Sequence, residues 1–216
     1  MLSNEEKMIL RKYGAIFKKW KQSQSGKNDI QIHKDHEKYI KLKLSSDNLS
    51  GITRTEFTEL YKHLWASEFW INKDWKVNKL LDENCLVNLI NELSFLLYGS
   101  EPFEKRYNLF RKKVKGFGIS TISEILSMIY PEKFCVWNNK TKSVLKFLNL
   151  KNNLTDTVFK NNSITGEEYS ICINYMSMVK NELYPYHVND FIYLNVFFWY
   201  IHKYIISKNQ KVEKSI

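Results

Sequence analysis

The stretch that decides the fold is residues 114–141, VKGFGISTISEILSMIYPEKFCVWNNKT. Two glycines, Gly116 and Gly118, stand one residue apart near its start. Apolar residues recur at helical spacing both before and after them, which predicts a helix on each side. Glycine lets a turn take positive φ and lets a backbone come close to a ligand. The pattern therefore predicts two helices joined by a tight turn, a motif that occupies 103–130.

This turn has the features of a phosphate contact. A helix that begins just after a tight turn points free N–H groups outward, and these suit a phosphate. Basic and hydroxyl side chains surround the turn, so the residues expected to contact DNA are Arg111, Lys112, Lys113, Lys115, Gly116, Gly118, Ser120 and Thr121. A dinucleotide-binding loop would need a preceding strand and a third glycine, and the sequence provides neither. A plain turn between two packed helices stays open as the alternative.

The same stretch resembles the helix-hairpin-helix of the DNA glycosylase superfamily that includes endonuclease III. The glycines and Thr121 match its pattern, and the aliphatic run Ile122, Ile125 and Leu126 follows. The resemblance is close over 114–141, and the helical layout around it extends along the chain. It implies an all-α fold of two helical lobes with the hairpin at their junction, and double-stranded DNA as the partner.

Two positions depart from the family's pattern. Bifunctional members carry a nucleophilic lysine where this chain has Ser120, and the family's aspartate falls at Asn138. An aspartate there can stabilise the cationic sugar or activate a water, whereas an amide carries no charge and is a poor base. Ser120 and Asn138 are therefore the candidate catalytic positions, in a chain that lacks both usual catalytic groups. Asn138 also precedes a helical pattern, so it is equally an N-cap.

Three functions stay open. The preferred one is a DNA-binding protein that recognises duplex DNA, including damaged or modified bases, without catalysis. The second is a DNA N-glycosylase, a hydrolase of base-excision repair, which lacks lyase activity because no lysine can form a Schiff base. The third is a protein-interaction domain in a defence system, in which the hairpin is a structural turn.

Composition agrees with a helical, DNA-binding chain. Of 216 residues, 44% are apolar, while glycine (7) and proline (3) are scarce, which disfavours β sandwiches and barrels. We expect a single domain with two lobes, 1–52 plus 151–216 and 53–150. The net charge of +10 favours a polyanion, namely DNA, RNA or an anionic membrane. General enrichment in lysine and asparagine is the alternative origin of that charge.

No cofactor is expected. The three cysteines, Cys85, Cys135 and Cys172, lie far apart and match no zinc or iron–sulfur spacing. His33 and His36, with acidic neighbours, invite a metal site, but their spacing matches none we can defend, so we expect no metal. The N-terminus, MLSNEEK, is charged and unlike a signal peptide, which favours the cytoplasm, near the nucleoid in a prokaryote.

Other segments follow from capping and periodicity. Capping boxes start three helices, Ser3 with Glu6, Thr53 with Glu56 and Thr165 with Glu168. A run of polar residues predicts a loop at 23–34, followed by a short helix at 35–43. The apolar run 189–206 contains Asn195, His202 and Lys203, which favours a buried terminal helix over a membrane span. Trp65, Trp70 and Trp75 either stack on bases or pack in the core, and we favour the core.

Overall fold

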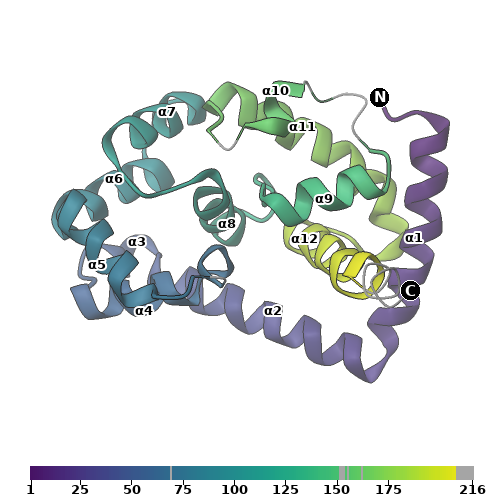
Figure 1. Ribbon diagram of the computed structural model, residues 1–216, viewed down its shortest axis with the longest axis horizontal. Helices are drawn as coiled ribbons and strands as arrows, with labels where there is room; N and C mark the ends of the chain where they lie inside the picture. Colours follow the sequence, from purple (N-terminus) through teal and green to yellow (C-terminus); the bar gives the residue numbers. More distant parts are fainter. Residues whose placement is uncertain (69, 151–153, 155, 162, 208–216) are drawn as a thin grey trace.

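The computed structural model describes residues 1–68, 70–150, 154, 156–161 and 163–207 (Figure 1). Every regular element in these residues is a helix, which confirms the all-α class. The α-helices are α1 (Asn4–Gln22), α2 (Gln24–Lys43), α3 (Ser46–Leu49), α4 (Arg54–His63), α5 (Lys73–Asn84), α6 (Leu86–Tyr98), α7 (Phe103–Lys113), α8 (Ile119–Ile129), α9 (Asn139–Phe147), α10 (Asp156–Lys160), α11 (Gly166–Leu183) and α12 (Phe191–Tyr200). Shorter elements are the 3-10 helices η1 (Trp65–Ser67) and η2 (Tyr184–Tyr186) and the π-helical η3 (Ile201–Ile206). Residues 151–153, 155, 162 and 208–216 of the predicted lobe segment 151–216 lie outside the described residues.

Side-chain caps begin several helices where the sequence predicts them. The three capping boxes are present at the starts of α1, α4 and α11. In each, the cap hydroxyl accepts from the backbone N–H of the glutamate, and the glutamate accepts from the backbone N–H of the cap. These contacts satisfy N–H groups that a helix start leaves unpaired.

The predicted loop at 23–34 is wrong, because these residues form the first half of α2, an unbroken helix of 20 residues. Ser23 caps it by accepting from the N–H of Gly26. Gly26 lies so close to the end of α1 that an added Cβ would be 2.1 Å from the carbonyl oxygen of Trp20. The buried residues of α2 are only Gly26, His33 and Ile40, which recur every two turns. Because so few of its residues are buried, the sequence of this segment resembles that of a polar loop.

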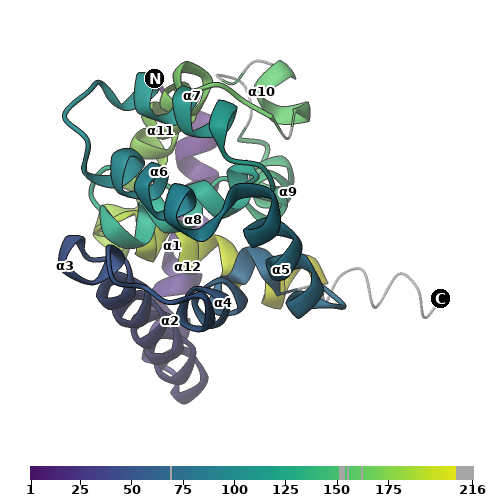
Figure 2. The same ribbon diagram turned by 90° about the vertical axis from the view of Figure 1, so that its left-hand side faces the viewer.

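The hairpin predicted at 103–130 is present as α7, a turn and α8. In Figure 1, α8 lies near the centre, α1 at the right edge, α2 along the bottom, and α5 and α6 on the left. Every residue of α8 from Thr121 to Met128 is buried, and α2, η1 and α12 pack against it. Seen from the left-hand side in Figure 2, α5 and α9 lie toward the same side of the molecule. Helix α8, the second helix of the hairpin, therefore lies at the middle of the fold.

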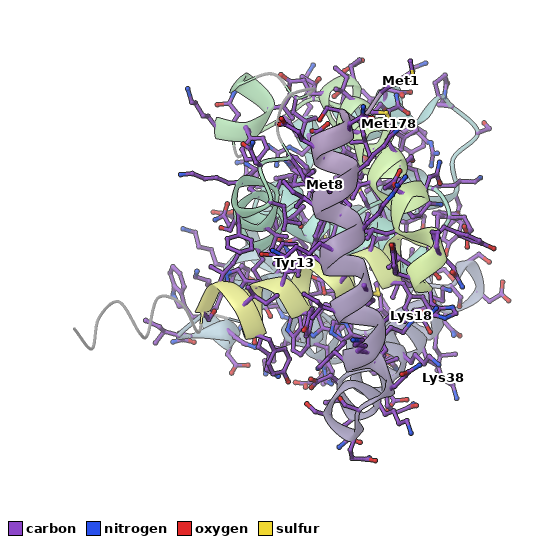
Figure 3. All side chains as sticks on the ribbon, turned by 90° about the vertical axis from the view of Figure 1, so that its right-hand side faces the viewer. Met1, Met8, Tyr13, Lys18, Lys38 and Met178 are labelled. Atoms are coloured by element: carbon purple, nitrogen blue, oxygen red, sulfur yellow. The ribbon has the colours of Figure 1, made fainter. Side chains whose placement is uncertain are left out.

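The apolar run at 189–206 forms the predicted buried terminal helix as α12, then continues as η3. Helix α12 packs against α1, α8 and α9, and α1 packs against α11. Figure 3 looks at the outer side of α1, with Met8 and Tyr13 along it. None of the helices in the described residues combines the length and the apolar character needed to span a bilayer. The division into two lobes stays a prediction.

Candidate nucleic-acid interface

The first glycine of the turn has a structural role. Gly116 has φ +82°, in the left-handed region that favours glycine, and a Cβ there would meet Leu80 of α5 at 3.2 Å. Asn84, also on α5, accepts from the N–H of Lys115 at 2.8 Å and donates to its carbonyl oxygen at 3.1 Å. The turn is thus held against the end of α5 and needs a glycine at this position.

The second glycine has no such constraint. Gly118 is the N-cap residue of α8, with φ −80° and ψ 168°, which any residue can adopt. A Cβ there would meet nothing within 4 Å, and no side chain caps α8. Open space and an uncapped helix start therefore coincide, which suits a close approach by a phosphate.

The basic residues before the turn divide into structural and exposed ones. The Arg111 guanidinium donates to the carbonyl oxygen of Phe117 at 2.6 Å and to a serine hydroxyl at 2.8 Å, so it holds the shape of the turn. Lys113 forms an ion pair with a glutamate of α6 at 2.6 Å. Lys112 and Lys115 have exposed side chains. The charges that best fit a phosphate contact are therefore those of Lys112 and Lys115.

A cavity of about 220 Å³ lies among α2, η1, α8, α9, α12 and η3. The lining residues that matter for its chemistry are His33, Trp65, Glu124, Asn138, Lys140 and Trp199. Pockets for drug-sized ligands span roughly 300–1,000 Å³. The smaller volume here suits a single heterocycle, such as one nucleobase.

Glu124 of α8 fixes one aromatic wall of the cavity. This carboxylate is only 2% exposed, and it accepts from the backbone N–H groups of Trp65 and Ala66, each at 2.8 Å. The Nε2 atom of His36 lies 3.1 Å from it. The imidazole of His36 stacks on the indole of Trp65, with ring centroids 4.0 Å apart and planes 14° apart. A buried carboxylate with this many donors is well satisfied, so Trp65 is held firmly in place.

His33 and Trp199 add further ring surface. His33 stands edge-on to Trp65 and to Trp199, with centroid distances of 4.4 Å and 5.2 Å. Burial lowers the pKa of His33 to about 4, and repulsion from His36 adds to the shift. The imidazole is therefore neutral at pH 7. Two indoles and a neutral imidazole form surfaces suited to a flat, aromatic ligand.

Asn138 lines the cavity at the start of α9, and α8 sets its position. The N–H of the preceding residue, the fully buried Trp137, donates to Oγ of Ser123 at 2.9 Å. Oδ1 of Asn138 accepts from the N–H of Thr141 at 2.9 Å, which confirms the predicted N-cap. Because Oδ1 is used by the cap, the group that Asn138 can offer a ligand is its NH2, a hydrogen-bond donor.

The remaining charged side chains of the cavity pair with one another. Glu68 binds Lys140 at 2.9 Å. Asp29 accepts from the hydroxyl of Tyr204 at 2.8 Å and lies 3.6 Å from Nζ of Lys203. The carboxylates of Asp29 and Glu68 are therefore engaged, as that of Glu124 is.

The structure separates the two candidate catalytic positions. Asn138 lines the cavity, whereas Ser120 is half-buried in the first turn of α8, outside the cavity lining. Thr121 is buried, so its hydroxyl is removed from the surface and only its backbone N–H is left for a phosphate. The hairpin contact and the cavity are distinct places joined by α8.

Sequence reasoning did not place three residues that shape the cavity, of which His33 was considered only as a metal ligand. Glu124 carries a local signal, because it is the single charged residue in the apolar pattern of 119–129 and such residues are rarely buried without a purpose. His33 and Trp199 carry none, because their neighbours come from helices distant in the chain. The described residues also hold no group of three His, Cys, Asp or Glu side chains placed to bind a metal ion.

Comparisons of the chain with protein-family models, curated proteins and solved structures found no match. The geometry of the turn and the chemistry of the cavity therefore carry the functional argument.

Proposed function

We propose that this chain binds duplex DNA through its hairpin, as the helix-hairpin-helix resemblance implies, and holds an extruded base in the cavity beside Asn138. The observation that carries the proposal is the cavity itself, which is base-sized and bounded by Trp65, Trp199 and a neutral His33. Proteins that act on or inspect a base take it out of the stack and hold it between aromatic side chains.

The polar groups of the cavity suit the edges of a base. Asn138 offers an amide donor, and Asn195 of α12 brings a second amide to the lining. Stacking of a base on an aromatic side chain is worth about 1–3 kcal/mol. Two indoles and an imidazole can therefore offset the few kcal/mol that extrusion costs.

The hairpin supports contact with the backbone of the same DNA. The uncapped start of α8 and the open space at Gly118 fit a phosphate, with Lys112 and Lys115 nearby in the chain. The cavity is reached along the same helix, since α8 also carries Glu124. The net charge of +10 adds a general attraction to DNA.

Recognition without bond cleavage fits the site better than hydrolysis. A glycosylase needs a carboxylate or another base near the sugar. The carboxylates of Asp29, Glu68 and Glu124 are engaged with protein partners, and Asn138 is an amide that caps α9. We therefore infer a non-catalytic reader of damaged, modified or distorted DNA.

The first test is duplex binding by fluorescence anisotropy across a salt series, for the parent chain and Gly118→Val. We expect affinity to fall steeply with salt. The variant should bind on the order of tenfold or more weakly, because an added side chain blocks the approach of a phosphate to the helix start. Weak binding that is equal in parent and variant would contradict the DNA-binding proposal.

The second test follows the extruded base with a duplex that carries 2-aminopurine. We expect the parent chain to change its fluorescence, and Trp65→Ala to lose most of that change. Tyr184→Ala, an exposed aromatic on η2, serves as the matched control and should behave as the parent. Release of a free base from a modified duplex, abolished in Asn138→Ala, would instead favour the glycosylase alternative.

A further inference from the structure

The structure separates the three tryptophans of 65–75 into three environments. Trp65 lines the cavity, and Trp70 is half-buried against Tyr61 with ring centroids 5.4 Å apart. Trp75 is 58% exposed, and Ile71, in the segment before α5, is fully exposed. Single exposed apolar side chains are common on protein surfaces, but here two large ones, four residues apart in the chain, lie in or just before the first turn of α5.

This apolar pair lies close to the cavity along the chain. Glu68, three residues before Ile71, forms its ion pair with Lys140 at the start of α9 and lines the cavity. Three residues of chain span at most roughly 11 Å, so Ile71 lies within about that distance of Glu68 in the cavity lining.

The surroundings of the pair favour a nucleic acid. Nζ of Lys76 lies 4.4 Å from the ring centroid of Trp70, and Nζ of Lys79 lies 5.3 Å from that of Trp75. The acidic residues of the same helix are ion-paired as well, Asp74 and Asp82 with a lysine and an arginine of α4, and Glu83 with Lys79 at 4.0 Å. Lysines beside exposed aromatic rings are the arrangement found in proteins that stack on unpaired bases.

The first turn of α5 presents Trp75 in a fixed position. Oδ1 of Asn72 accepts from the N–H of Trp75 at 2.9 Å and so caps the helix. The cap fixes the backbone at Trp75, so the indole extends from a defined point on the surface.

We propose that Ile71 and Trp75 stack on unpaired bases next to the base held in the cavity, and so give this chain a preference for DNA that contains unpaired nucleotides. This inference rests on the proposed function. Apolar side chains that enter the base stack favour sites where stacking is already broken, because unpaired bases are the least costly to displace.

The test compares the dissociation constants for a fully paired duplex and for the same duplex with a short unpaired bulge. We expect the parent chain to prefer the bulged duplex on the order of tenfold or more, and the double variant Ile71→Ser/Trp75→Ala to bring the ratio close to one. Trp75→Phe should keep most of the preference, because a ring remains. Met8→Ser/Tyr184→Ala changes two similarly exposed side chains, on α1 and on η2, and should keep the parent ratio. Helix α1 lies at the edge of the molecule opposite α5 (Figure 1).

A parent ratio near one, or a double variant that retains the parent ratio, would overturn this inference while leaving DNA binding by the hairpin intact. Equal loss of affinity for both duplexes in the double variant would also overturn it, because the pair would then contribute no preference. Failure of the proposed function has a different signature, since the parent chain would then bind neither duplex in a salt-dependent way. Thermal unfolding of each variant checks that the fold is retained.

Discussion

The hairpin turn and the cavity beside Asn138 are built by opposite means. The turn is a contiguous segment, held by contacts from the helices beside it, such as Asn84 on Lys115 and Arg111 on Phe117. The cavity draws on six elements, and side chains such as Glu124 and His33 in it contact residues distant in the chain. A substitution in the turn therefore strains the backbone locally, whereas a substitution in the cavity disturbs the packing of several elements.

This difference ranks the expected cost of mutations. A nearly buried carboxylate with several donors is costly to remove, because each donor loses its hydrogen-bond acceptor. A glycine with positive φ costs only local backbone strain when replaced. The following experiments measure that ranking, from the largest effect to the smallest.

Glu124→Ala should lower the free energy of unfolding by about 3–5 kcal/mol, since it leaves buried N–H groups of η1 without an acceptor. Urea unfolding measures the loss. Glu59→Ala removes an exposed carboxylate that pairs with Lys62, and should cost less than about 0.5 kcal/mol. A loss below about 1 kcal/mol for Glu124→Ala would mean that packing alone holds Trp65. It would contradict the ranking of the cavity above the turn in mutational cost.

A comparison of the parent chain with a His33 variant shows the part of the pH dependence of stability that comes from His33, because His202, whose pKa is also lowered by burial, contributes to both curves. The folded pKa of His33, about 4, lies below the ordinary 6.5, so the unfolded chain binds the proton more readily. The stability that this group contributes is present above 6.5 and is lost as pH falls toward 4, by about 2–3 kcal/mol between pH 7 and 4.5. His33→Phe should flatten the curve in that window. This pH range lies above the range in which Glu56 is protonated, because the cap contacts of Glu56 hold its pKa near 2.

Gly116→Ala should lower the free energy of unfolding by about 1–2 kcal/mol, because alanine resists φ +82°. Gly118→Ala should change it by less than about 0.5 kcal/mol, since its backbone is ordinary and its surroundings are open. Chemical unfolding of the two variants side by side makes the comparison. Equal losses would show that the second glycine is also a structural requirement.

The helical class, the capping boxes, the hairpin and the cap at Asn138 could be predicted because each depends on residues within a few positions of one another. The extent of α2 could not, because a buried glycine and two other buried residues give too weak a periodicity. The cavity could not either, since His33, Glu124 and Trp199 meet only after distant helices pack. Asn138 was found through local capping and the family resemblance, whereas Trp65 and His33 were named without being placed in a shared site.

Helix α8 has a mechanical consequence for the proposed complex. Its first turn faces the phosphate, and about 6 Å further along its axis Glu124 grips η1 and the indole of Trp65. The helix thus rigidly connects the contact with the DNA backbone to the contact with the base. A shift of α8 that improves one contact displaces the other. The length of the helix therefore fixes the spacing between the bound phosphate and the inspected nucleotide. A reader built this way measures distance along the strand as well as the identity of a base.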